Sequence, residues 1–546
     1  MSTVNLAILE TTTIGKEKLE QFYKVVFASL GYETKIFNIS ENDESAKNGY
    51  GIFESESIDV FVSDLSLGEK ETYDGLIVIK KIKRVYPSLL VIANSRTNVT
   101  FVEAASHIPS FDIFVSKSKI HDKAYQEYIT GKVKSLFTKN VYLADFDIDK
   151  ALEKSKFFKK AKDKIQLMDM LKAITFTSNN NDKSTAVNKV TLSAMPGGYS
   201  GSEVYRISAF THSKLKCINA VIKISTKDNY IEEMGNYLKF VKWYLPYTFR
   251  PELIGSAETK DYGALCYSFA YNDEVPFKSL TEYLRVGDSA KLGIAIDSIF
   301  DPKHQRWYHE KNIEQNQNIT GYYFNKWFLD RRVDEKEFCQ VIRGQKNATV
   351  YDNEVIINEQ KYPKPEGFLL GTPRNEHNTC ICHGDLNSDN ILITENGGLT
   401  FIDFQNTKRG HIFEDFVVFE TCIRLHVKYS EEFNVLIDDE WILNECAINS
   451  VDYNVDNCSD IKRSFYPQVL KVREYAKLNA PNESRINYFY ALALYCFRLL
   501  RFETLLIWQK EQVIACLLSA EKMIKSLESI SNPTVAESLI YAKLKN

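Results

Sequence analysis

The stretch HGDLNSDNIL, residues 383 to 392, constrains the fold of this chain more than any other feature of its sequence. Asp385 and Asn390 lie close together in it, and Asp403 follows further along, between apolar residues in FIDF. An aspartate can orient and deprotonate an attacking hydroxyl, while an asparagine and a second aspartate can hold Mg²⁺ through hard oxygen atoms. The pattern indicates phosphoryl transfer, in a fold that brings both segments to the same phosphoryl group.

A glycine-rich turn is expected upstream of this motif. VTLSAMPGGYSGSEVYRISA reads as a strand, a turn with Gly197, Gly198 and Gly201, and a second strand. Glycines allow a backbone to lie close to phosphates, whose oxygens its N–H groups can bind. Many such turns are only hairpins, so the interpretation depends on the residues that follow.

A lysine and two glutamates come next in the chain. Lys223 stands among the apolar residues of the strand NAVIKIS, and Glu232 and Glu233 lie on the helix NYIEEMGNYLKFVKWYL. A lysine on such a strand can reach nucleotide phosphates if a helix glutamate orients it. Either glutamate could take that part.

These features, in this order, resemble the aminoglycoside phosphotransferase and choline kinase branch of the protein-kinase-like fold. That branch carries H-G-D where protein kinases carry H-R-D, and I-D-F where they carry D-F-G. The resemblance implies an N-lobe of strands and one helix over residues 186–275 and a helical C-lobe over residues 276–546. It implies a hinge near residues 266–271, whose backbone would meet adenine.

The same resemblance implies roles for single residues. Asp385 would be the catalytic base, and Asn390 and Asp403 would be the Mg²⁺ ligands. Lys223 would contact the ATP phosphates beside the glycine-rich turn, paired with Glu233, which fits the spacing to the end of the helix better than Glu232 does. ATP and Mg²⁺ are therefore the expected cofactors.

One longer stretch narrows the resemblance. FIDFQNTKRGHIFEDFVVFETCIRLHV resembles a little-studied bacterial group of such domains, found in multidomain signalling or defence proteins. Asp415 and Glu420 would be its structural acids, and Asp415 is expected to hydrogen-bond the catalytic loop. Phe419 stands where the group usually has leucine. His383 is expected to support the loop rather than to react.

Residues 1–140 are expected to form a doubly wound, five-stranded α/β domain. Short apolar strands alternate there with amphipathic helical patterns such as DGLIVIKKIKRVYP, which favours a parallel sheet. Ligand chemistry in such sheets gathers at the carboxyl ends of the strands. Asp64, Ser95 and Lys117 fall at three of those ends.

This part of the chain resembles the response-regulator receiver family, through DLSLGEKETYDGLIVIKKIKRVYPSLLVIANS and FDIFVSKS. The resemblance implies Asp64 as a phosphoacceptor supported by Ser95 and Lys117, and a histidine kinase or another signalling protein as partner. Receivers usually carry two acids after the first strand, but here the pair is Glu10 and Thr11. Two alternatives stay open, a receiver that takes phosphate and a pseudo-receiver used only for docking.

Residues 141–185 are expected to form a helical connector and linker. Phe158, Ala161, Ile165 and Met168 lie at helical spacing, with lysines on the other face. The stretch TSNNNDKST that follows is small, polar and without apolar anchors, as expected of a linker.

Composition excludes several classes of function. The net charge of −4 gives no reason to expect nucleic acid or an anionic membrane as a partner. The start, MSTVNLAILETTT, lacks the features of a signal peptide, and the apolar run from Ile486 to Phe497 ends at Arg498, too early to span a bilayer. The ten cysteines form no paired CxxC set, which is typical of reduced core thiols. A cytoplasmic protein is expected.

Two classes of function remain. The first is an ATP-dependent kinase that phosphorylates a hydroxyl on a small molecule or on a protein, with the small molecule favoured, under the control of the receiver-like domain. The second is a nucleotide-binding signalling module without catalysis. The segment 286–375, rich in aromatic residues, is expected to shape the acceptor pocket in the first case, and helix packing, the commoner role of such residues, stays open as the alternative.

Overall fold

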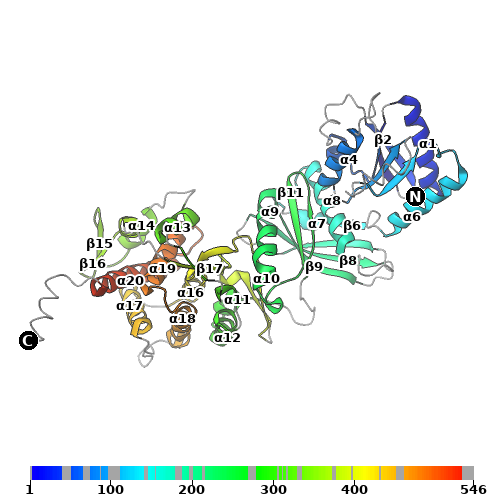
Figure 1. Cartoon of the computed structure of the whole chain (residues 1–546). Helices are drawn as coiled ribbons and strands as arrows, with labels where there is room; N and C mark the ends of the chain where they lie inside the picture. The colour runs from blue at the N-terminus through cyan, green and yellow to red at the C-terminus, as the bar shows by residue number, and fades with distance from the viewer. Residues whose placement is uncertain are drawn as a thin grey trace, which may run out of the picture. The chain divides into compact units, whose positions relative to one another are not determined.

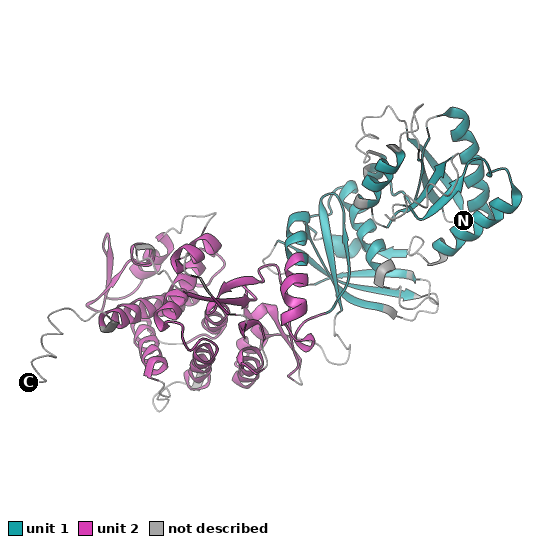
Figure 2. Ribbon diagram, in the orientation of Figure 1, with its two compact units in different colours: residues 1–234, 252–270 teal, residues 235–251, 271–546 magenta. Residues whose placement is uncertain are grey.

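The chain divides into two compact units, residues 1–234 with 252–270 and residues 235–251 with 271–546 (Figure 2). The first unit contains a parallel and a largely antiparallel sheet, and the second is mainly helical. The computed structural model describes residues 3–10, 12–39, 51–65, 74–86, 88–95, 111–139, 145–153, 155–178, 187–195, 201–211, 216–268, 278–303, 306–309, 311–314, 318–328, 335–371, 377–394, 397–429, 432–449 and 460–531.

The parallel sheet has five strands in the order β2-β1-β3-β4-β5, and each neighbouring pair is parallel (Figure 1). The sequence predicted five such strands, and the order is that of a doubly wound sheet with its switch point between β1 and β3. The elements are β1 (Thr3–Leu9), α1 (Thr13–Ser29), β2 (Glu33–Ile39), α3 (Gly51–Ser55), β3 (Val60–Asp64), α4 (Asp74–Val85), β4 (Leu90–Ser95), β5 (Ile113–Ser116) and α6 (Lys123–Lys139).

Helices cover both faces of this sheet. On one face Leu6 and Ile8 of β1 pack with residues of α1 and α6, and on the other Ala7 and Leu9 pack with residues of α3 and α4. Neighbouring residues serve opposite faces because side chains alternate along a strand. Burial on both faces explains why the strands read as unbroken apolar runs.

The second sheet has the order β10-β11-β9-β8-β7-β6. Its strands pair antiparallel except β6, which comes from the segment predicted to be a connector and pairs parallel with β7. The elements are β6 (Asp145–Asp147), α7 (Asp149–Leu152), α8 (Ala161–Ser178), β7 (Val187–Ala194), β8 (Glu203–Thr211), β9 (Lys216–Thr226), α9 (Lys227–Asn236), β10 (Leu253–Glu258) and β11 (Tyr262–Ser268).

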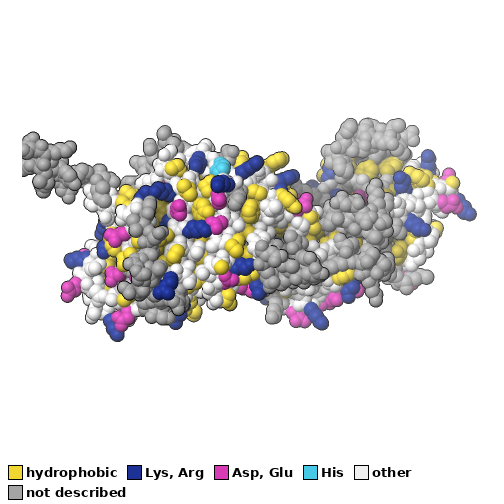
Figure 3. Space-filling model, turned by 90° about the horizontal axis from the view of Figure 1, so that it is seen from below, with side chains coloured by type: hydrophobic (Ala, Val, Ile, Leu, Met, Phe, Trp, Pro, Cys, Tyr) yellow, Lys and Arg dark blue, Asp and Glu magenta, His cyan; other side chains and the backbone are white. Residues whose placement is uncertain are grey.

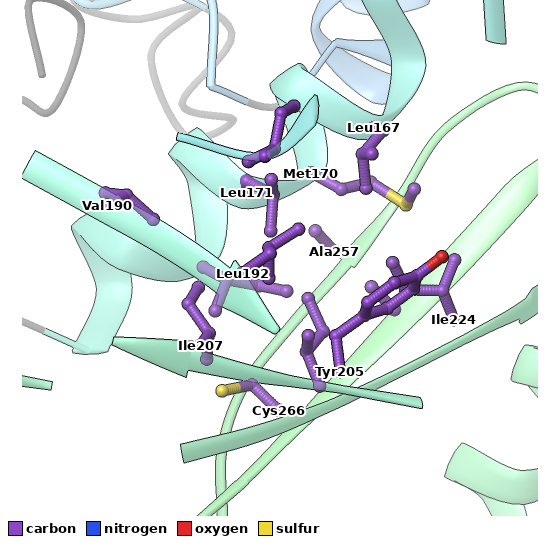
Figure 4. Packing of buried hydrophobic residues seen from close by; sticks show 14 of the residues in the cluster. Leu167, Met170, Leu171, Val190, Leu192, Tyr205, Ile207, Ile224, Ala257 and Cys266 are labelled. Carbon is purple, nitrogen blue, oxygen red and sulfur yellow. The ribbon is translucent and has the colours of Figure 1, made fainter. Parts of the chain in front are cut away.

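Helix α8 buries more of its surface than the face predicted for it. Leu167, Met170 and Leu171 pack into the core over the second sheet, next to strand residues such as Leu192 and Ile207 (Figure 4). Of the four residues predicted as the apolar face, Phe158 belongs to that buried core and the half-buried Met168 packs against it, whereas Ala161 is exposed. The prediction assumed one buried face, whereas α8 is covered on two sides.

The other side of α8 contacts the region of the parallel sheet. The Ser88 hydroxyl donates a hydrogen bond to Asp169, and the Nζ of Lys172 lies 3.2 Å from Oδ1 of Asp59. Burial raises the pKa of Asp169 to about 7, opposed by the Ser88 hydrogen bond and the charge of Lys172. A small cavity at this contact is lined by Met168 and other residues of both partners.

The second unit is built from helices with three small three-stranded sheets. Its elements are η2 (Tyr237–Val241), α10 (Lys242–Tyr244), η3 (Tyr247–Phe249), β12 (Lys278–Ser279), α11 (Leu280–Arg285), α12 (Ser289–Phe300), η4 (Trp307–His309), β13 (Asn312–Glu314), α13 (Ile319–Trp327), α14 (Lys336–Arg343), β14 (Ala348–Val350), β15 (Glu354–Ile357), β16 (Gln360–Pro363), α15 (Pro365–Gly371), β17 (His377–Cys382), η5 (Ser388–Asn390), β18 (Ile391–Ile393), β19 (Leu399–Phe401), β20 (Lys408–His411), α16 (Glu414–His426), α17 (Phe433–Asn449), α18 (Asp460–Asn479), α19 (Arg485–Leu499) and α20 (Ile507–Ser531).

Across the described ranges, every helix is too short or too polar to cross a bilayer. On the face shown in Figure 3, basic and acidic side chains are interspersed.

Candidate functional site

The carboxyl edge of the parallel sheet brings predicted residues together. Glu10 follows β1, Asp64 ends β3, Ser95 ends β4 and Lys117 follows β5. The Nζ of Lys117 lies 2.5 Å from Oε2 of Glu10 and forms an ion pair with Asp64 as well. The three charged side chains are nearly buried, so two carboxylates share one ammonium group away from bulk water.

This edge has the groups that an acyl phosphate needs, which are a carboxylate nucleophile, a cation and a hydroxyl. The Oε1 of Glu10 accepts a hydrogen bond of 3.2 Å from the Thr12 hydroxyl, which also caps α1 by accepting from the N–H of Gly15. Thr11, which replaces the usual second acid, lies outside the described residues, as do residues 66–73.

In the second sheet, Lys223 of β9 and Glu233 of α9 form a buried ion pair, with Nζ 2.8 Å from Oε2. The Tyr267 hydroxyl of β11 donates to Oε1 of Glu233 at 3.2 Å. Glu232 is exposed, so the structure pairs the lysine with Glu233 and not with its neighbour. A lysine held in this way is suited to contact phosphate oxygens.

The glycine-rich turn is described only at its end. Gly201 has a φ of +72°, in the left-handed region that favours glycine. Gly197 and Gly198 lie outside the described residues, as does the end of the predicted hinge, residues 269–271.

The HGD loop lies in the second unit, between β17 and β18. The Asn387 side chain shapes its second half by accepting hydrogen bonds from the N–H groups of Asp389 at 3.0 Å and Asn390 at 3.1 Å. The Asn390 amide then donates to the Asp385 carbonyl oxygen at 2.9 Å and to its Oδ2 at 3.3 Å. The predicted base and one predicted metal ligand are thus in direct contact.

Asp415 of α16 holds the first half of the loop, as the sequence suggested. Its carboxylate accepts the backbone N–H groups of His383 at 2.8 Å and Gly384 at 2.9 Å, and the Tyr308 hydroxyl at 3.2 Å. Burial and the neighbouring Glu414 raise the pKa of Asp415 to about 7, although the two N–H donors oppose the shift.

Asp403 follows β19 with a φ of +65°, which is uncommon for a residue other than glycine. Its neighbours anchor this turn to the HGD loop. The N–H of Ile402 donates to the Asn390 carbonyl at 3.0 Å, the Ile402 carbonyl accepts Nε2 of His383 at 3.0 Å, and Phe404 is buried. Burial lowers the pKa of His383, so the ring is neutral and supports the turn by donating from Nε2.

Asn390 and Asp403 have the right chemistry for Mg²⁺. The amide nitrogen of Asn390 is used toward Asp385, which leaves its oxygen for a cation, and carboxylate and amide oxygens are ligands that Mg²⁺ accepts. The described part of the chain has no group of three or more His, Cys, Asp or Glu side chains that could hold a metal ion. Water and phosphate oxygens would therefore complete the coordination shell, as is usual for Mg²⁺ bound with a nucleotide.

Three charged residues near the loop were not found from the sequence. Lys326 and Glu414 form an ion pair, and a Cβ on Gly384 would lie 3.1 Å from the Lys326 Nζ. Burial raises the pKa of the Asp385 carboxyl, and Arg498 is the charged neighbour that opposes this most. Lys326 lies within an aromatic segment and Arg498 ends an apolar run, so a charge among apolar residues was the available signal.

Comparison with known proteins gives one family match. The profile of the phosphotransferase enzyme family matches residues 358–431, which contain the HGD loop, Asp403 and Asp415. No curated protein matches the chain. The chain therefore carries a segment similar to phosphotransferase enzymes.

The solved structures that resemble this chain have low sequence identities and low TM-scores. An ethanolamine kinase from Plasmodium vivax is 14% identical, with 69% of this chain and 95% of that chain covered and a TM-score of 0.28. An aminoglycoside phosphotransferase from Streptomyces rimosus is 12% identical, with 56% and 97% covered and a TM-score of 0.26. The response regulator RcsB from Salmonella typhimurium is 22% identical, with 26% and 70% covered and a TM-score of 0.19.

Proposed function

We propose that the chain is a phosphotransferase that uses ATP and Mg²⁺ to phosphorylate a hydroxyl group, on a small molecule rather than a protein. The observation that carries the proposal is the contact between Asp385 and Asn390, in a loop bonded to the Asp403 turn through His383 and Ile402. The match of residues 358–431 to phosphotransferase enzymes supports it.

Each residue has one task in the proposed reaction. Asp385 takes the proton of the acceptor hydroxyl, whose oxygen then bonds to the γ-phosphorus of ATP while the bond from that phosphorus to the β–γ bridging oxygen breaks. ADP leaves with the bond electrons, and the products are ADP and a phosphate monoester. Lys223, oriented by Glu233, binds phosphate oxygens in this scheme, and Mg²⁺ held by Asn390 and Asp403 would neutralise their charge.

Two substitutions test the assignment because they should fail differently. Asp385→Asn keeps size and leaves the metal ligands, so Mg·ATP should still bind while turnover falls by about 10²–10⁴-fold. Asp403→Asn removes a charged ligand, so ATP binding that depends on Mg²⁺ should weaken too. Both are measured by calorimetric titration with ATP, with and without Mg²⁺, and by ATP consumption. Wild-type binding by Asp403→Asn would refute the metal assignment, and full turnover by Asp385→Asn would refute the base.

We further propose that the parallel-sheet domain is a receiver that takes phosphate on Asp64 and regulates the phosphotransferase. The ion pairs of Lys117 with Asp64 and Glu10 support this. Acetyl phosphate with Mg²⁺ should add one phosphoryl group, seen by mass spectrometry of the intact chain, and Asp64→Asn should abolish it. Lack of labelling in a folded wild-type chain would instead support a docking-only domain.

A further inference from the structure

Helix α8 is bonded to the parallel-sheet domain at the amino ends of two of its strands. The Ser88 hydroxyl, just before β4, donates to Asp169, and Asp59, just before β3, forms an ion pair of 3.2 Å with Lys172. The opposite ends of the same two strands carry the proposed phosphoacceptor Asp64 and its supporting hydroxyl. The helix is therefore held by the two strands that build that site.

One turn earlier, Gln166 bonds α8 to the second sheet. Its Nε2 donates to Oδ2 of Asp261 at 2.9 Å, and its Oε1 accepts the N–H of Asp261 at 3.0 Å. Asp261 lies in the turn between β10 and β11, and Gln166 is buried. Leu167, Met170 and Leu171 of the same helix pack over the sheet (Figure 4). A shift of α8 would therefore move the turn with it.

This turn in its place holds the start of α9. The Asp261 carbonyl accepts the N–H of Lys227, the first residue of α9, at 3.0 Å, and the Thr259 carbonyl accepts the Lys227 Nζ at 3.2 Å. Close packing adds to these bonds, since a Cβ on Gly263 of β11 would lie 2.1 Å from Cγ of Tyr230. The β10–β11 hairpin thus fixes the first two turns of α9.

Glu233 lies on the next turn of α9. Its carboxylate pairs with Lys223 at 2.8 Å and accepts the Tyr267 hydroxyl at 3.2 Å. The energy of a buried ion pair depends steeply on the distance between its charges, so a small displacement of α9 changes how Glu233 orients the lysine. All these contacts lie within the first compact unit, and they connect β3 and β4 to the lysine proposed to bind ATP phosphates.

The contact of α8 with the parallel-sheet domain is less complete than its contact with the second sheet. The Oδ2 of Asp169 is buried without a hydrogen-bond partner among the described residues, and a cavity of about 20 Å³ is lined by Asp169 and Lys172. The amide oxygen and nitrogen of Gln166, by contrast, are both bonded. A contact with an unpaired polar atom and a void rearranges at lower cost than a filled core, so this is where a change in the parallel-sheet domain would act on α8.

We infer that α8 is a regulatory element that couples the parallel-sheet domain to the Lys223–Glu233 pair through Gln166 and Asp261. This inference rests on the proposed function, whose regulation it describes. Gln166 and Asp261 are positioning residues, since they act on Lys223 only through α9. The Ser88 bond to α8 and the ion pair of Lys223 are present together in the structure, so the intact contact supports ATP binding and its loss weakens binding.

The first experiment is a double-mutant cycle on the full chain, with Mg·ATP affinity measured by calorimetric titration. Ser88→Ala and Gln166→Met should each raise Kd by about 5–10-fold, the lower end of typical allosteric couplings. Ser88→Ala should have less than about a 2-fold effect once Gln166→Met is present, because the connection is already broken. The controls are Ser57→Ala, an exposed serine at the same cavity, and Lys164→Met, an exposed lysine on the same helix, and both should bind as wild type.

A purely structural contact would lower the melting temperature and leave the Kd of the folded chain unchanged. Wild-type Kd in folded Ser88→Ala would therefore overturn the inference. Equal fold changes with and without Gln166→Met would overturn it too, since the effect would then bypass Gln166. Lys172→Met breaks the same contact at its other bond and replaces Ser88→Ala in the cycle if that variant does not fold.

The second experiment needs no nucleotide. Hydrogen exchange of residues 227–236, followed by mass spectrometry, should be about 5–10-fold faster in Ser88→Ala than in wild type, because the start of α9 opens more often. In the Gln166→Met background Ser88→Ala should add nothing, and unchanged exchange in Ser88→Ala alone would contradict the coupling.

The outcomes separate the inference from the proposed function. Failure of the wild type to bind Mg·ATP would refute the phosphotransferase, while hydrogen exchange would still decide whether α8 couples the two sheets. Failure of acetyl phosphate to label Asp64 would refute the receiver, while the double-mutant cycle, which needs no phosphorylation, would still decide the coupling.

Discussion

Two aspartate sites in this chain hold their carboxylates in opposite ways. At the edge of the parallel sheet, Asp64 shares the ammonium group of Lys117 with Glu10. In the HGD loop, Asp385 contacts the Asn390 amide and forms no ion pair within the described ranges, and burial raises its pKa. The same residue type is thus compensated by a cation in one place and left to an amide in the other.

Under the proposed function, the difference corresponds to two kinds of chemistry. A carboxylate that is to be phosphorylated has to stay ionised to act as a nucleophile, and a close ammonium group favours the ionised form. A carboxylate that is to take a proton works better without an ion-pair partner, since a proton acceptor needs a pKa nearer the working pH. The partner of an aspartate therefore tells more about its use than its position at a strand end or in a loop.

The largest effect is expected when the cation of the first site is removed. Lys117→Met leaves Glu10 and Asp64 side by side without compensation, which should lower the stability of this region by about 3–5 kcal/mol. Urea denaturation of the full chain measures this, with the exposed Lys119→Met as control. Adding Asp64→Asn should restore part of the loss, and an unchanged midpoint for Lys117→Met would show that the shared cation does not stabilise the site.

A third buried aspartate, Asp169, should make the folding stability depend on pH. Because the folded pKa of Asp169 is about 7, above the unfolded value of 3.8, it binds its proton more tightly when folded. Its contribution to stability is complete below the unfolded value and is lost as pH rises to about 7, by about 4 kcal/mol in total.

Asp169→Asn should therefore flatten the fall in stability between acid and neutral pH. The measurement is thermal melting of wild type and variant at a series of pH values. Asp415 titrates in the same range, so the difference between the two curves isolates Asp169. Parallel curves would mean that Asp169 is ionised in the folded chain at acid pH.

A smaller effect is expected at the lysine of the second sheet. Glu233→Gln removes the charge that orients Lys223, and Mg·ATP binding should weaken by about 10-fold. Glu232→Gln is the matched control, because this neighbour is exposed and should leave affinity unchanged. Calorimetric titration distinguishes the two, and equal effects would contradict the pairing.

The smallest effect is expected from Tyr267→Phe, which removes one hydrogen bond of 3.2 Å to Glu233 and keeps the ring. Stability should fall by about 1 kcal/mol and ATP affinity should change less than with Glu233→Gln. A larger loss of affinity than in Glu233→Gln would show that the tyrosine, and not the glutamate, holds the lysine.

Local patterns predicted the parallel sheet and most of the candidate residues. Asp64, Ser95 and Lys117 follow apolar strands, and parallel strands necessarily end at one edge. The sequence pattern could not show that α8 buries two faces. An aspartate such as Asp169 is expected at the surface, and only the structure shows that it is buried and bonded to Ser88.

The sequence did not predict which charged residues lie beside the HGD loop, for a related reason. Arg498 is placed near Asp385 by the packing of α19, and nothing in the local sequence of either residue encodes that contact. Its position at the end of an apolar run argued only against a membrane span. Charges placed by tertiary packing remain invisible to periodicity.

Gly384 leaves no room for a side chain at the middle position of the HGD motif. Its φ of +78° is strained for any other residue, and a Cβ would lie 2.2 Å from the Asn406 carbonyl oxygen. The arginine that protein kinases carry in H-R-D thus has no room here, and the guanidinium that acts on Asp385 belongs to Arg498 of α19. The segment HGDLNSDNIL therefore does not contain all the charged groups that act on Asp385. If the segment were grafted onto another protein, Asp385 and the Asn390 amide would be transferred, but the Arg498 guanidinium of α19 would not.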